Sequence, residues 1–101
     1  MEKFIYYNEL FNIYSSFINE NNSNIFKLYY EENLSMQEIS DLVGVTKSRV
    51  GIIIKNTEHK LDKLENNLEL YKKKNILEDL LLIDDINIIK ENISKQILPW
   101  T

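Results

Sequence analysis

The spacing of hydrophobic positions predicts helices along the chain, and two short ones stand at its centre. Between Ser35 and Lys63, apolar residues recur every three or four positions on either side of a turn at Val43-Gly44-Val45. Gly44 stands where a tight turn needs a positive φ, which glycine adopts without a Cβ clash. Two short helices joined in this way are typical of a helix-turn-helix. An ordinary αα-hairpin inside a helical bundle is the alternative.

Residues at the start of each short helix support this interpretation. Ser35 and Glu38 have the spacing of a capping box, and Thr46 is a favourable N-cap for the second helix. We expect the inner face of the motif to collect the apolar side chains of both helices, with Val45 closing the turn into the core. That inner face comprises Ile39, Leu42, Val43, Val50 and Ile53.

The opposite face of the second helix supplies the candidate binding residues. On a helix that begins at Thr46, outward side chains would enter the major groove of DNA, with the first turn nearest the bases. The outward residues are Lys47, Ser48, Gly51, Ile52, Lys55 and His59. Arg49 and Lys60 lie at the flanks of this face, where they suit contacts with phosphate. The sequence therefore predicts a nucleic-acid-binding segment from Thr46 to Lys60, within a helix-turn-helix core at residues 35–60.

Apolar stripes predict further helices on both sides of the motif. One is expected from residue 4 to about residue 18 and another from about residue 23 to residue 32. The aromatic residues of the first suit a buried core better than a base-stacking platform. The second helix of the motif is expected to continue to about Tyr71, because no Gly or Pro interrupts it.

The last part of this long helix carries a further apolar stripe with heptad spacing. Its members are Leu61, Leu64, Leu68 and Tyr71. An exposed stripe of this kind needs a partner. The partner is the N-terminal helix, the C-terminal helix or a second subunit, the last of which would make a homodimer through the long helix.

The C-terminal third predicts more helix. Lys72 to Lys74 form a basic cluster that suits a solvated helix end better than a phosphate site. Asp84-Asp85 would begin a last helix that ends at Pro99. We therefore expect an all-α fold in a single domain over residues 1–101: a helical bundle with a helix-turn-helix and a long C-terminal helical extension at residues 61–101.

Composition agrees with this fold class. The chain has 101 residues, of which only 2 are Gly and 1 is Pro, too few turn-formers for a many-stranded β protein. Cysteine is absent, which excludes disulfides and thiolate metal sites and fits a cytoplasmic location. The most apolar run, Leu80 to Ile83, is far shorter than the ~20 residues of a membrane-spanning helix. The first ten residues lack the layout of a signal peptide.

Charge singles out the predicted binding helix. The chain as a whole carries a formal net charge of −4, but residues 46–63 hold 5 basic residues against Glu58 and Asp62. Residues 1–45 and 64–101 are both net acidic. An acidic body weakens long-range attraction to a phosphate backbone. Nucleic-acid binding is therefore expected to be modest, salt-sensitive and confined to one face.

The residues that support catalysis are few. His59 is the only histidine, and it falls on the outward face of a long helix without a nucleophile or carboxylate partner in the pattern. The chain has no Gly-rich phosphate loop, no metal-ligand cluster and no nucleophile motif. Asp84 and Asp85 are adjacent and point apart on a helix. We expect no enzyme, no catalytic residue, no bound metal and no cofactor.

Two resemblances appear in the same residues. The segment from Leu34 to Leu64 resembles the helix-turn-helix in region 4 of sigma-70-type factors. A longer stretch, from about Asn8 to Lys74, resembles the YlxM family of small bacterial helix-turn-helix proteins. The pieces that carry it are Leu28-Tyr29-Tyr30, Leu34-Ser35 with Glu38-Ile39, Val45-Thr46, and Ile54-Lys55 with Thr57-Glu58.

The YlxM resemblance implies a sigma-region-4-like fold and a nucleic-acid-binding regulatory role in the signal recognition particle pathway. The expected partners are DNA and the RNA or protein components of that particle. Sigma factors have Arg and Gln where this chain has Gly51 and Ile52, and commonly Arg where it has Lys47. Ile52 can touch a thymine methyl but cannot hydrogen-bond a base edge. This difference favours the alternative role, a protein- or ribonucleoprotein-binding accessory factor of protein targeting that does not bind DNA.

Overall fold

The computed structural model describes residues 2–82, 90, 91, 93 and 95. These residues form five α-helices and one 3-10 helix, without a strand among them, which confirms the all-α prediction. No helix in this described part is long and apolar enough to cross a membrane. The chain divides into two compact units, residues 1–68 and 69–101. The single domain expected over the whole chain stays a prediction.

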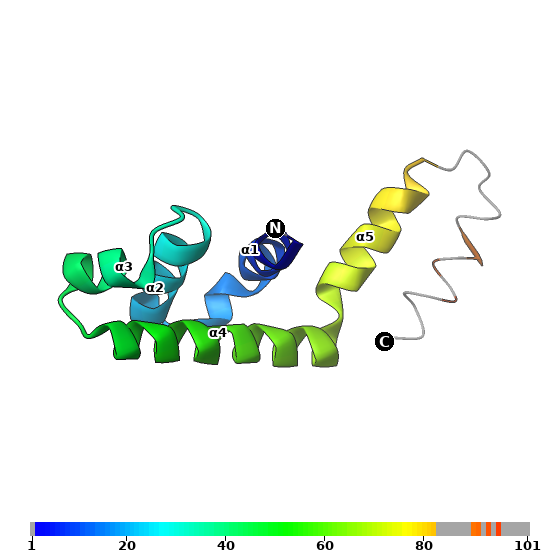
Figure 1. The fold of residues 1–101 in the computed structure, drawn as a ribbon. Helices are drawn as coiled ribbons and strands as arrows, with labels where there is room; N and C mark the ends of the chain where they lie inside the picture. Colours follow the sequence, from blue (N-terminus) through cyan, green and yellow to red (C-terminus); the bar gives the residue numbers. More distant parts are fainter. Residues whose placement is uncertain (1, 83–89, 92, 94, 96–101) are drawn as a thin grey trace. The chain divides into compact units, whose positions relative to one another are not determined.

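The first unit is built around one long helix. Its elements are α1 (Glu2–Tyr14), a 3-10 turn (Ser15–Phe17), α2 (Glu20–Tyr30), α3 (Met36–Val43) and α4 (Lys47–Leu68). Helices α1, α2 and α3 all pack against α4, and Figure 1 shows them along the same side of it. The other side of α4 is therefore left open within this unit.

The core lies between α4 and the three shorter helices. It includes the fully buried side chains of Leu10, Tyr14, Phe26, Tyr30, Ile39, Val50 and Leu61. The aromatic stripe of the N-terminal helix is thus core, as predicted, up to Tyr14. The prediction is wrong for Phe17, whose side chain is 52% exposed. The chain leaves the α-helix after Tyr14 and continues as a 3-10 turn, which carries Phe17 away from the stripe.

The helix caps of the motif are confirmed. The Ser35 side chain accepts from the Glu38 N–H at 3.1 Å, while the Glu38 carboxylate accepts from the Ser35 N–H at 3.0 Å. This backbone hydrogen bond lowers the pKa of Glu38. Gly44 has a φ of 76°, the left-handed conformation that the turn requires. The Thr46 hydroxyl accepts from the Arg49 N–H at 3.1 Å and caps α4.

The predicted inner face is only partly right. Ile39, Val50 and Ile53 are buried, but Leu42 is 65% exposed, and Val43 and Val45 are also exposed. Helix α3 has only 8 residues, so little more than two turns can pack on the unit. Its C-terminal end and the turn project beyond the core, and Val45 does not close the turn into it.

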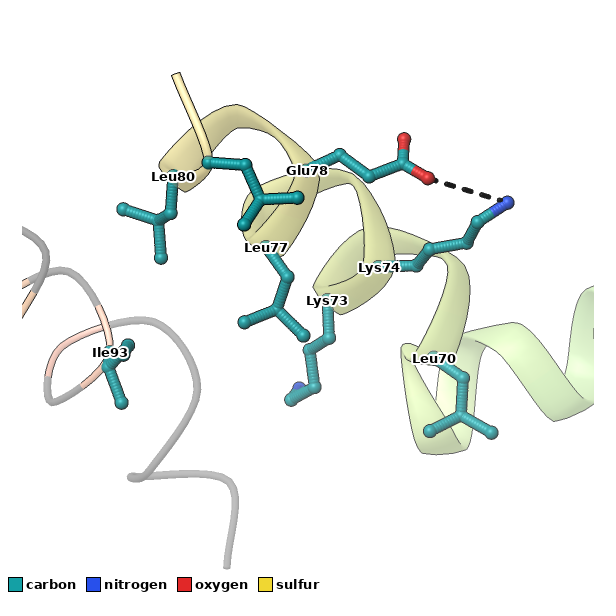
Figure 2. Close-up of a pocket in the computed structure, with 8 residues that line it drawn as sticks. Leu70, Lys73, Lys74, Leu77, Glu78, Leu80 and Ile93 are labelled. Atoms are coloured by element: carbon teal, nitrogen blue, oxygen red, sulfur yellow. Dashed lines mark ion pairs between the residues drawn. The ribbon is translucent and has the colours of Figure 1, made fainter. Parts of the chain in front are cut away.

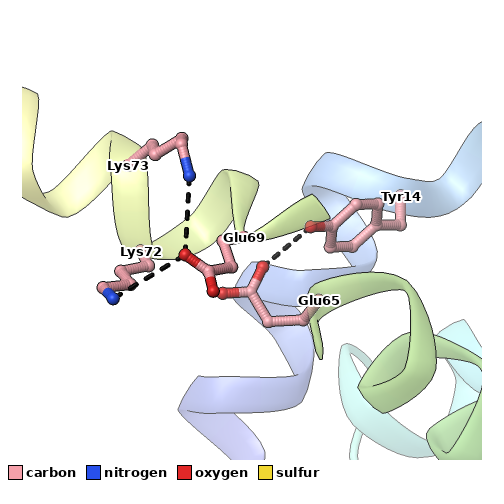
Figure 3. A network of polar contacts seen from close by, with 5 residues as sticks. All are labelled: Tyr14, Glu65, Glu69, Lys72 and Lys73. Atoms are coloured by element: carbon pink, nitrogen blue, oxygen red, sulfur yellow. Dashed lines mark hydrogen bonds and ion pairs between the residues drawn. The ribbon is translucent and has the colours of Figure 1, made fainter. Parts of the chain in front are cut away.

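Three tyrosines join α1 and α2 to one flank of α4. Each hydroxyl donates to a carboxylate, and we call the set the tyrosine–carboxylate ladder. Its pairs are Tyr7 with Asp62 at 2.9 Å, Tyr14 with Glu65 at 2.7 Å, and Tyr30 with Glu58. Figure 3 shows the Tyr14–Glu65 pair. The acidic positions are four and three residues apart, so they share one side of the helix.

The ladder gives each of three acidic side chains an uncharged hydrogen-bond donor. Glu58 is 9% exposed and would be costly to bury without its hydrogen bond from Tyr30. Of the basic residues in α4, none forms an ion pair with a carboxylate in the described part of the chain. Lys3, from α1, lies 3.8 Å from the Glu58 carboxylate.

Helix α4 ends three residues earlier than predicted. Glu69 has a φ of 53°, a left-handed conformation that interrupts the helical hydrogen-bond pattern without Gly or Pro. Tyr71 therefore belongs to α5 (Leu70–Leu80), and the predicted stripe is not one continuous helical face. Leu61 is fully buried inside the first unit, while Leu64 and Leu68 are half-buried.

In the second unit, the basic cluster stands near the N-terminal end of α5 and not at a C-terminal helix end. The Glu69 carboxylate lies 3.7 Å from Lys72 Nζ and 3.5 Å from Lys73 Nζ. Figure 3 shows both ion pairs. Lys73 is only 7% exposed. The predicted role of the cluster, complementing the negative end of a helix dipole, is wrong because these lysines lie near the N-terminal end of α5, where the dipole is positive.

Apolar side chains of α5 line a pocket of about 540 Å³ in this unit. Figure 2 shows Leu70, Leu77 and Leu80 around it, together with Ile93 and the Lys74–Glu78 ion pair. Lys74 Nζ lies 3.8 Å from the Glu78 carboxylate. The predicted helix start at Asp84-Asp85 lies outside the described residues, as do Pro99 and Trp100.

The ladder predicts a loss of stability at alkaline pH. Burial, followed by the hydrogen bond to Asp62, raises the pKa of Tyr7 above its ordinary value of about 10. The folded state thus holds this proton more tightly than the unfolded state. The resulting stability is complete below pH ~10 and is lost as the pH rises above it. Burial and Glu58 raise the pKa of Tyr30 in the same direction.

We expect Tyr7→Phe to cost about 1 kcal/mol at pH 7, from the lost hydrogen bond, and to make the alkaline decline less steep. The free energy of unfolding, measured by urea titration of both proteins from pH 7 to 11, checks this. Parallel curves for the wild type and the variant would contradict it.

Candidate functional site

The open side of α4 carries the exposed cations of the helix. Val50, Ile53, Ile54, Thr57 and Leu61 face the core, and the exposed residues lie around the rest of the helix. We call the exposed basic set the basic face of α4. It comprises Lys47, Arg49, Lys55, His59, Lys60 and Lys63.

Acidic and basic side chains of α4 differ in how they are engaged. Glu58 and Asp62, the two acidic residues among residues 46–63, turn toward α2 and α1 and accept hydrogen bonds from Tyr30 and Tyr7. Because these carboxylates are engaged there, the net positive charge of this segment is presented outward. The arrangement thus separates acidic side chains that are engaged by tyrosines from basic side chains that are exposed.

The basic face is long enough to contact several phosphates. At 1.5 Å per residue, the distance along α4 from Lys47 to Lys63 is about 24 Å. Adjacent phosphates are closer together than this along a nucleic-acid strand. Flexible ammonium groups suit phosphate oxygens as point charges, while the Arg49 guanidinium can make two parallel hydrogen bonds.

Most of the predicted site residues are exposed. Lys47, Ser48 and Arg49 form the first turn of α4, and Ile52 is 50% exposed on the next turn. The remaining exposed members of the prediction are Lys55, His59 and Lys60. Thr46 is exposed too, but its hydroxyl is used as the N-cap and is held against the Arg49 N–H.

Gly51 is not on the outward face. It is half-buried, and a Cβ placed on it would lie 3.6 Å from Met36 Sδ of α3. At 100° per residue, position 51 falls near position 58, on the flank that faces the shorter helices. The expectation that Gly51 points outward is therefore wrong.

Two exposed residues of this face were missing from the prediction. Asn56 and Lys63 lie on it, and Lys63 also lines a shallow pocket of about 470 Å³. The rest of that pocket is formed by His59, Lys60, Leu64 and Asn67. The spacing of residues 56, 60, 63 and 67 already places them on one side of a helix, so the pattern alone could have revealed them.

A second exposed feature lies at the turn of the motif. Leu42 is 65% exposed, Val43 39% and Val45 36%. These three residues form what we call the apolar tip. Exposed apolar clusters are one feature of surfaces that bind other molecules.

The chemistry that these features support is binding. The basic face suits a polyanion, and the apolar tip suits a protein surface. His59 is exposed, and the described part of the chain contains no group of three His, Asp or Glu residues that could hold a metal ion.

Known proteins match the chain over most of its length. The model of the family UPF0122, described as "Putative helix-turn-helix protein, YlxM / p13 like", matches residues 1–98. A UPF0122 protein of Clostridium acetobutylicum is 35% identical over 95 residues, covering 92% of this chain and 82% of the relative.

Two further relatives agree with this match. A UPF0122 protein of Mycoplasma capricolum subsp. capricolum is 34% identical over 106 residues, covering 99% of this chain and 92% of the relative. One from Oceanobacillus iheyensis is 35% identical over 92 residues, covering 87% and 88%. No solved structure matches the chain. The chain belongs to the UPF0122 family of YlxM/p13-like helix-turn-helix proteins.

Proposed function

We propose that this protein is a nucleic-acid-binding regulator that docks the basic face of α4 onto a phosphate backbone. The observation that carries the proposal is the separation of charge on α4. Its acidic side chains are engaged by tyrosines on the inner flank, and its exposed cations have no carboxylate partner within the described residues.

The same electrostatics limit the affinity. Five lysine or arginine side chains on the basic face can replace about five counterions on a duplex, which gives a steep salt dependence. The body of the protein is acidic and adds no long-range attraction. Ser48 and Ile52 offer few hydrogen bonds to base edges, so binding depends on backbone contacts more than on sequence.

The cellular pathway that we propose follows from the resemblance to the YlxM family. We place this activity in the signal recognition particle pathway, with the RNA of that particle and DNA as the nucleic-acid candidates. This setting implies a cytoplasmic location. A homodimer through the long helix stays part of the proposal, with Leu64 and Leu68 as its remaining contacts because Leu61 is already buried in the first unit.

Removing two cations tests the proposed interface. We expect the double variant Arg49→Ala with Lys55→Ala to bind duplex DNA and signal recognition particle RNA more weakly. The plot of log affinity against log salt, whose slope is negative, should become less steep by about 2, because two phosphate contacts are lost. Fluorescence anisotropy of labelled nucleic acid, measured over a series of salt concentrations, gives both quantities.

Lys27→Gln is the matched control, because Lys27 is an exposed cation of α2 and not of α4. It should leave the affinity and the salt slope near those of the wild type. An unchanged salt slope in the double variant would overturn the proposed interface.

The apolar tip favours a second candidate function. Leu42, Val43 and Val45 are exposed at the end of the motif, where a protein partner could cover them. In this alternative, the helix-turn-helix serves as a scaffold, and the protein is an accessory factor that binds the protein or ribonucleoprotein components of the targeting machinery. Ile52, exposed on α4, would extend the apolar contact.

We expect Leu42→Ser to weaken binding to the protein components of the signal recognition particle, while duplex binding changes little. Calorimetric titration of the purified components measures this effect. Ile5→Ser is the matched control, because Ile5 is 60% exposed on α1. Equal losses in the two variants, or none in either, would count against the tip as a docking surface.

A further inference from the structure

A small pocket opens beside the basic face, where all four helices of the first unit meet. Its volume is about 160 Å³, and its lining includes Lys3 of α1, Tyr29 of α2, Met36 of α3 and Lys55 of α4. Gly51 also lines it and contributes no side chain of its own. Lys55 belongs both to this pocket and to the basic face, so the two features are continuous.

Tyr29 is the aromatic wall of the pocket. Its ring is half-buried and is held by Phe4, at 5.5 Å between ring centroids, and by Tyr30 at 5.1 Å in an edge-on arrangement. A ring fixed in this way loses little conformational freedom when a second aromatic group stacks on it. Nucleobases stack on such rings whatever their sequence.

The pocket contains two lysines and one carboxylate. Lys3 and Lys55 supply ammonium groups for a phosphate, and the Lys3 side chain is 64% exposed. The third charged group is Glu58, whose carboxylate accepts from Tyr30 and lies 3.8 Å from Lys3 Nζ. Two ammonium groups against one carboxylate leave a net positive charge that favours a phosphate, and an uncharged base is favoured beside the Tyr29 ring.

We propose that this pocket receives one unpaired nucleotide of the nucleic acid that lies on the basic face. The base stacks on Tyr29, and the flanking phosphate contacts Lys3 and Lys55. The volume suits a single base and not a base pair. The inference rests on the proposed function, and it specifies a ligand: a helical nucleic acid with a nucleotide outside the stack, as in a bulge or a loop.

The test compares two ligands of equal charge. One is a duplex with a single unpaired nucleotide, and the other is the same duplex with an abasic residue at that position. Anisotropy titrations of the full chain are made with a DNA pair and with an RNA pair. We expect the wild type to prefer the ligand that has the base by about 5-fold or more, the lower end of what stacking one base contributes. A preference in either pair supports the proposal.

Two Tyr29 variants form the matched set. Tyr29→Phe keeps the ring and should retain the preference. Tyr29→Leu removes the stacking surface and should bring the ratio of the two affinities close to 1. Lys3→Gln should weaken binding of both ligands by a few-fold, since the phosphate is present in each. Circular dichroism at increasing temperature checks that the variants are folded.

Gly51→Met provides a second route if Tyr29→Leu does not fold. The space beside Gly51 accommodates a Cβ at 3.6 Å from Met36 Sδ, and the longer side chain would fill the pocket and abolish the preference. Equal wild-type affinity for the two ligands would overturn this inference but would not affect the proposed docking of the basic face on a phosphate backbone. Absence of binding to every ligand would overturn the proposed function as well.

Discussion

The hydrogen bonds from tyrosine hydroxyls to the carboxylates of α4 are the contacts on which the rest of this structure depends. They attach α1 and α2 to the long helix, and they give buried or half-buried acidic groups a partner that carries no charge. A lysine could also donate a hydrogen bond to such a carboxylate, but that lysine would then be less available to bind a ligand. With tyrosines in this role, the cations of α4 stay available to a ligand.

Charge separation of this kind explains how an acidic protein presents a basic surface. The body carries the excess of acidic residues, yet those of α4 accept hydrogen bonds from tyrosines while its cations are exposed. The surface is narrow, as wide as one helix, and about 24 Å long between Lys47 and Lys63. Such a strip suits a phosphate backbone more than a broad specific interface. The pocket around Tyr29 adds a place where one base can be read by stacking.

Much of this could be predicted from the sequence, because it depends on local rules. The capping box at Ser35, the turn at Gly44 and the N-cap at Thr46 each follow from one or two residues and their immediate neighbours. The break at Glu69 could not be predicted, because a left-handed glutamate has no signature of its own. The exposure of Leu42 and Val45 and the inward position of Gly51 depend on where a short α3 ends against α4, which periodicity does not determine. The ladder could not be predicted either, because its tyrosines and carboxylates are far apart along the chain.

An amide NMR titration of the labelled protein tests the central claim most directly. Duplex DNA and signal recognition particle RNA would be added in turn, each at low and at moderate salt. If the basic face docks on the backbone, shifts will appear on the exposed residues of α4, from Lys47 to Lys63, and will fade as salt increases, while the ladder residues Asp62 and Glu65 change little. Shifts confined to the ladder flank, or no shifts with either ligand, would contradict this claim.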